Sequence, residues 1–97
     1  MDNTERRHVF GTKHSVFTDY VGQIMRGEMN LDDVPEHHRK TAASLLLLPI
    51  YRQAVRVLSE PTREKRAAAL LRLPETIRTA VEIEARRVFK YRQEIKK

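Results

Sequence analysis

Histidine is the residue type in this chain best suited to bind a metal or move a proton, and the only adjacent pair is His37 and His38. Neighbouring residues on a helix point about 100° apart, and no other histidine lies three or four positions away, so the two rings are poorly placed to share one ion. Asp32, Asp33 and Glu36 come just before them, where carboxylates ordinarily cap a helix. We therefore expect no metal site.

The residues that could support catalysis form no recognisable pattern. Ser15, Ser44 and Ser59 stand in no spacing with histidine and aspartate that indicates a triad. The chain has three glycines, none in a phosphate-binding loop, and no cysteine to serve as a nucleophile or form a disulfide. A helical chain of 97 residues also has little room for a deep pocket. The sequence predicts a protein that is not an enzyme and needs no cofactor.

Charge is the feature that points to a partner, because the net charge of +6 is unevenly placed. Residues 1–34 carry a net charge of −2, whereas residues 35–97 carry +8. A concentrated positive field attracts phosphates or acidic protein surfaces, although it also describes an ordinary solvated helix face. We expect contacts to nucleic acid, to a nucleoprotein or to another anionic partner from nine cations: Arg63, Lys65, Arg66, Arg72, Arg78, Arg86, Arg87, Lys90 and Arg92.

The alternative is a protein-interaction module that binds an acidic protein surface or assembles as a homo-oligomer. On a helical wheel of the last helix, Phe89 and Ile83 lie away from the predicted core stripe and on different sides of it. Exposed apolar residues of this kind can mark an interface, although single ones are common on any surface. An amphipathic helix lying on an anionic membrane is a third and weaker possibility.

The compartment follows from what the sequence lacks. No stretch reaches the roughly 18 to 20 apolar residues of a membrane span, and the polar N-terminus has no signal-peptide core. Without cysteine, nothing calls for an oxidising environment. We expect a cytoplasmic protein.

The elements that would position these residues all have helical periodicity. Apolar residues recur at helical spacing in residues 15–27, 35–59 and 74–95, and a shorter helix is expected over residues 62–73. Pro49 should either kink the second helix or start a new one, while Pro61 and Pro74 mark corners. The predicted fold is all-α, a compact bundle of four or five short helices with proline-marked corners, preceded by an arm or irregular segment over residues 1–14.

The predicted core includes most of the four-leucine run at residues 45–48, which covers every face of a helical turn and should be buried all round. The full list is Phe17, Tyr20, Ile24, Leu45, Leu46, Leu48, Ala54, Val55, Leu58, Leu70, Leu71, Leu73, Ile77, Val81, Val88 and Tyr91.

An internal similarity relates two parts of the chain. Residues 40–49 and 65–74 share a lysine, two alanines, three leucines and a proline at an offset of 25, and the third leucine directly precedes the proline. This pattern predicts a single domain, residues 1–97, built from two related helix-Pro-helix units at 35–59 and 61–95. Chance recurrence of common helix residues is an equally good explanation.

Overall fold

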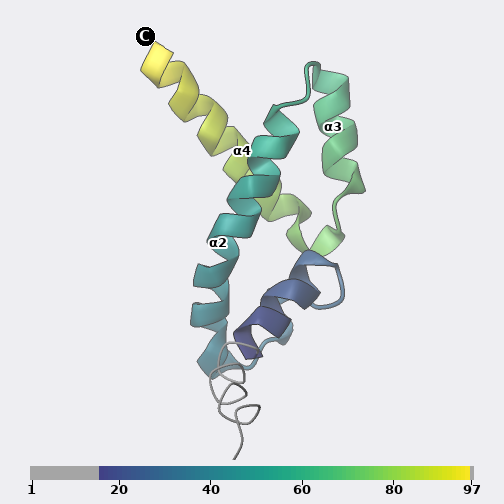
Figure 1. Ribbon diagram of the computed structural model, residues 1–97, viewed down its shortest axis with the longest axis vertical. Helices are drawn as coiled ribbons and strands as arrows, with labels where there is room; N and C mark the ends of the chain where they lie inside the picture. The colour runs from purple at the N-terminus through teal and green to yellow at the C-terminus, as the bar shows by residue number, and fades with distance from the viewer. Residues whose placement is uncertain (1–15, 97) are drawn as a thin grey trace, which may run out of the picture.

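The computed structural model describes residues 16–96, and all of their regular structure is helical (Figure 1). An N-terminal helix covers residues 16–25 and is followed by the short 3-10 helix η1 (Leu31–Asp33). Three further helices complete the chain: α2 (Glu36–Leu58), α3 (Arg63–Arg72) and α4 (Glu75–Lys96). No strand occurs in this described part, so the all-α prediction is confirmed. The predicted arm at residues 1–14 lies outside it.

The core is centred on the crossing of the two long helices α2 and α4, which form the most extensive contact between elements (Figure 1). Alanines take two of the most deeply buried positions on α2, and a small side chain lets a neighbouring helix approach closely. The buried residues of α2 are Ala42, Leu46, Ala54 and Val57, and those of α4 are Ile77, Val81, Ala85 and Val88. All of these residues except Val88 form one buried cluster, which Ile24 and Val34 of the N-terminal segment complete.

The prediction that the leucine run is buried all round is wrong. Leu46 is 4% exposed, whereas Leu45 is 48%, Leu47 70% and Leu48 54% exposed. Consecutive side chains of a helix point in different directions, and only one side of α2 packs on the buried cluster. The other three leucines therefore stay about half exposed or more, because no element within residues 16–96 covers them fully.

Two further predicted core residues, Leu71 and Tyr91, are also exposed, at 70% and 63%. Leu71 lies on the outer side of α3, and Tyr91 lies near the end of α4, where the bundle no longer covers the helix. Four residues missing from the predicted list are buried instead: Val34, Ala42, Val57 and Ala85. Small or turn-adjacent residues become core when helices cross beside them, which helical periodicity alone does not reveal.

The four prolines occupy different positions relative to the helices. Pro35 is the N-cap of α2, Pro61 lies between α2 and α3, and Pro74 lies between α3 and α4. Pro49, by contrast, lies inside α2, which continues through it although proline has no N–H to donate to the carbonyl of Leu45. Hence no new helix starts at Pro49. The two proposed repeat units adopt different conformations at their Leu-Pro steps, and the duplication stays a prediction.

A glycine terminates the N-terminal helix. Gly27 has a φ of +85°, its N–H donates to the carbonyl of Ile24, and the N–H of Glu28 donates to Gln23. This pair of hydrogen bonds is a Schellman motif, in which the residue just after the helix adopts a left-handed backbone conformation, as Gly27 does. The Thr76 hydroxyl at the start of α4 also donates to the Ile24 carbonyl at 2.6 Å. The Schellman bonds end the N-terminal helix, and the Thr76 bond ties that end to the beginning of α4.

Candidate partner-binding grooves

One of the nine predicted contact residues, Arg78, makes internal hydrogen bonds. Its Nε donates to the carbonyl of Leu70 at 3.3 Å, and its Nη2 donates to Leu71 and Leu73 at 3.3 and 2.8 Å. The last carbonyls of a helix have no intrahelical donor, and a cation there also complements the helix dipole. Arg78 therefore caps the C-terminus of α3 and holds it beside α4.

Two more of the predicted cations are paired with glutamates of the same helix. Arg86 contacts Glu82 at 2.7 Å, and Arg87 contacts Glu84 at 2.7 Å with a second bond at 2.9 Å. The hydrogen bonds from Arg87 lower the pKa of the Glu84 carboxyl, and Glu84 in turn raises the pKa of Arg87. The Arg87–Glu84 pair is bidentate, and a charge-assisted pair of this type holds both side chains in a defined geometry.

The remaining six cations differ in exposure and in whether they have a hydrogen-bond or ion-pair partner within residues 16–96. Half-buried Arg66 donates to the carbonyl of Glu60 at 3.1 Å. The other five are exposed and have no carboxylate within ion-pair distance in residues 16–96: Arg63, Lys65, Arg72, Lys90 and Arg92.

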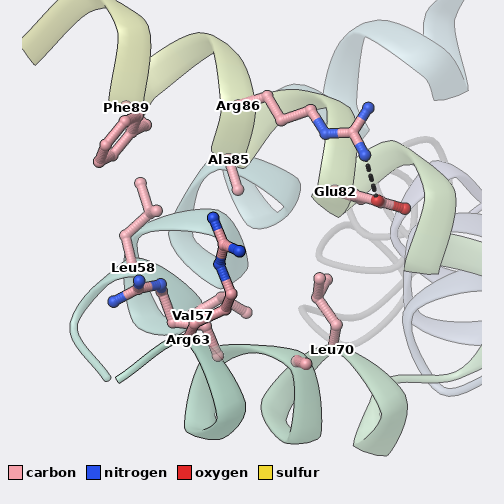
Figure 2. A pocket seen from close by; sticks show the side chains of 10 residues that line it. Val57, Leu58, Arg63, Leu70, Glu82, Ala85, Arg86 and Phe89 are labelled. Carbon is pink, nitrogen blue, oxygen red and sulfur yellow. Dashed lines mark hydrogen bonds and ion pairs between the residues drawn. The ribbon is translucent and has the colours of Figure 1, made fainter. Parts of the chain in front are cut away.

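The first groove lies between α3 and α4, over the C-terminal end of α2, and has a volume of about 410 Å³. We call it the arginine groove, because three guanidiniums line it together with one carboxylate and an apolar surface. Its lining residues are Val57, Leu58, Arg63, Arg66, Ala67, Leu70, Glu82, Ala85, Arg86 and Phe89. Figure 2 shows Phe89 near Leu58 and Arg63 at one end, and Leu70 beside the Glu82–Arg86 pair at the other.

The second surface lies on the opposite side of the crossing between α2 and α4. Two adjoining grooves of about 580 and 320 Å³ share Tyr51 and Arg87. We call this surface the leucine–tyrosine face and define it by five exposed residues: Leu47, Leu48 and Tyr51 of α2, with Ile83 and Tyr91 of α4.

The two predicted interface residues are both exposed, Ile83 at 60% and Phe89 at 53%. They belong to different surfaces, because Phe89 lines the arginine groove and Ile83 lines the leucine–tyrosine face. Sequence reasoning missed Leu47, Leu48 and Tyr51 as surface residues. A usable signal was present, since four consecutive leucines cannot all face one neighbouring helix.

The histidine pair belongs to an aromatic cluster. The His37 and His38 rings are 4.0 Å apart, and the Tyr20 hydroxyl lies 3.1 Å from Nδ1 of His38. Phe17 packs edge-on against the His38 ring with centroids 5.1 Å apart. No group of three or more metal-ligating side chains occurs between residues 16 and 96. The cluster joins the N-terminal helix to the beginning of α2.

Comparison with known proteins provides no relative for this chain: no family model, no curated protein and no solved structure matches it. Among the helices of residues 16–96, none combines the length and apolarity that a bilayer span requires.

Proposed function

We propose that this protein is a non-enzymatic binding module that docks an acidic, amphipathic segment of a protein partner in its arginine groove. The observation that carries the proposal is the combination, in one open groove, of an apolar surface with three guanidiniums and a single carboxylate. An amphipathic helix lays its apolar face into such a groove, and its acidic residues pair with cations at the rim. The +6 charge of the whole chain favours an acidic partner as well.

Phe89 is the anchor of the proposed contact. Its side chain is 53% exposed and lies near Leu58, so it offers a large apolar surface that a partner can cover (Figure 2). Aromatic residues and arginines at the centre of an interface commonly contribute most of its binding energy. Phe89 and Arg63 lie at the same end of the groove (Figure 2).

Arg63 is the cation best placed to meet a partner carboxylate. Arg86 already pairs with Glu82, and Arg66 donates to the Glu60 carbonyl. Arg63 is exposed, and no carboxylate of residues 16–96 pairs with it. Because an exposed rim contact is screened by salt, we expect the affinity for an acidic segment to fall as ionic strength rises.

The proposal is tested with a fluorescent helical peptide of about 16 residues that carries leucines at i, i+3, i+4 and i+7 and glutamates elsewhere. Anisotropy titration should give saturable binding that weakens about tenfold or more in Arg63→Glu and in Phe89→Ala, the loss typical of an interface hot spot. The matched control is Arg72→Glu, which makes the same charge change on α3 outside the groove. It should alter the affinity no more than about twofold.

Equal weakening by Arg63→Glu and Arg72→Glu would mean that the peptide responds only to net charge, and would exclude the groove as its site. Saturable binding that is unchanged in Phe89→Ala would exclude the apolar contact. Absence of binding to the wild-type protein would contradict the proposed function as a whole.

Nucleic-acid binding through the C-terminal helix is the second candidate, favoured by one observation. Lys90 and Arg92 are exposed near the end of α4 and have no carboxylate partner in residues 16–96. Cations in such a position are available to phosphates, and binding through them would be steeply salt-dependent.

Random-sequence duplex DNA tests this candidate at about 50 and 200 mM salt. Binding through α4 should be lost when Lys90→Glu and Arg92→Glu are combined, and retained when Lys40→Glu and Arg52→Glu make the same charge change on α2. If both double variants lose binding equally, or the wild-type protein binds at neither salt, α4 is not a nucleic-acid site.

The cytoplasm is the compartment that we propose for this protein and its partner. The chain contains no cysteine and so has no need of an oxidising environment.

A further inference from the structure

We infer that the leucine–tyrosine face binds a second copy of this chain, so that the protein is a homodimer whose two arginine grooves remain open. The inference is independent of the proposed function, because the two surfaces lie on opposite sides of the crossing between α2 and α4 and share none of their lining residues.

The first argument is the size of the apolar surface. Leu47 is 70% exposed, Leu48 54%, Tyr51 42%, Ile83 60% and Tyr91 63%. A monomer seldom exposes a contiguous apolar patch of more than a few hundred Å². Five large side chains at these exposures make a patch at the upper end of the roughly 300–600 Å² that the largest patch of a typical monomer covers, and patches of that size are often interaction sites. Such a patch can form the centre of an interface that buries about 800 Å² per partner.

The second argument is charge. Among residues 16–96, Glu84 is the only acidic residue that lines this face, and Arg87 holds it in a bidentate pair, so these two charges are balanced within one copy. In the same range, Arg92 is the one other charged residue that lines it. Two copies that each carry a net charge of +6 repel one another. The electrostatic repulsion is smallest when they meet through surfaces of low local charge. An acidic partner, by contrast, is attracted to the arginine groove.

The third argument is symmetry. A two-fold dimer requires a patch that is complementary to itself, and apolar side chains of similar size on two adjacent helices satisfy this requirement without matched charges. Helices α2 and α4 of each copy would then form a four-helix layer across the axis. The dimer also accounts for two exposed leucines of the run, because Leu47 and Leu48 would be buried by the second copy as Leu46 is by its own chain.

The experiment is a mass measurement by size-exclusion chromatography with light scattering on the full chain at about 100 µM. The wild-type protein should have twice the chain mass of 11.4 kDa. Combining Leu47→Glu with Ile83→Glu should return the mass to that of one chain, because each copy would then bury uncompensated carboxylates in the contact. Helical content by circular dichroism should stay unchanged, since both residues are exposed in a single copy.

The matched control is Leu71→Glu. Leu71 is exposed to the same 70% as Leu47 but lies on α3, outside the leucine–tyrosine face. Its variant should keep the doubled mass. The inference is overturned if the wild-type protein has the mass of one chain, if the double variant still has the doubled mass, or if Leu71→Glu is as disruptive as the double variant.

Salt and one further variant separate this inference from the proposed function. Raising the salt concentration screens repulsion between two cationic copies and should strengthen the dimer, whereas it should weaken the docking of an acidic peptide. Arg63→Glu should lose the peptide and keep the doubled mass. A dimer that is lost in Arg63→Glu, while helical content is retained, would place the contact at the arginine groove and contradict the inference.

Discussion

Truncation of Leu46 to alanine should lower the free energy of unfolding by about 2–5 kcal/mol, the range measured when a buried leucine leaves a cavity. Leu46 is 4% exposed and belongs to the buried cluster at the crossing of α2 and α4. A loss of this size is a large share of the 5–15 kcal/mol that stabilises a typical domain. Urea unfolding followed by circular dichroism measures it as a shift of the midpoint at constant slope.

Leu71→Ala is the control for this prediction, because it removes the same atoms from a leucine that is 70% exposed. Its effect should stay within about 0.5 kcal/mol, as is usual for surface positions. Both variants leave the leucine–tyrosine face intact, so dimer formation does not distort the comparison. Equal losses in the two variants would contradict the orientation of α2 and α3 described above.

Replacement of Gly27 by alanine should destabilise the protein by about 2–5 kcal/mol for two reasons that act together. The φ of +85° costs a residue with a Cβ about 1–2 kcal/mol. A Cβ at this position would also lie 2.9 Å from Cβ of Pro74, in a ring that cannot rotate away, and overpacking of that kind adds about 1–3 kcal/mol. Thermal or urea unfolding should show the loss directly.

Gly22→Ala is the matched control, since it makes the same change within the N-terminal helix. Its added Cβ would lie 2.9 Å from Nη1 of Arg26, the far end of an exposed side chain that can move aside. Alanine is favoured over glycine inside a helix by about 0.5–1 kcal/mol, so this variant should be as stable as the wild-type protein or slightly more stable. If Gly27→Ala proves equally harmless, Gly27 and Pro74 are not in close contact.

The proposed arrangement has a functional consequence. A dimer formed through the leucine–tyrosine face leaves two arginine grooves available, so that one assembly can hold two acidic segments. Two linked sites raise the overall affinity for a partner with two such segments without any new contact. The protein would then act as a bridge between partner chains.

Local features of the sequence determined much of the fold. Helical periodicity, the glycine at Gly27 and the prolines at Pro61 and Pro74 indicate where helices run and where two of the turns lie, because these signals depend on backbone geometry within a few residues. The uneven charge likewise showed that the cations are concentrated in residues 35–97, since charge is a property of the residues themselves. Three of the nine predicted contact residues line the arginine groove: Arg63, Arg66 and Arg86.

Only the tertiary structure decided which side of each helix meets a neighbour. Leu46, Leu47 and Leu48 are identical in type, yet one is buried and two form an exposed face, because α4 covers a single side of α2. Arg78 and Arg63 are equally cationic, but the packing of α3 beside α4 turns Arg78 onto backbone carbonyls and leaves Arg63 at the groove. The sequence by itself determined the helices, their ends and the charge of the chain, which are local properties. The buried side of each helix, the division of the cations and the two grooves depend on contacts between distant residues, and the packing of the helices alone decided them.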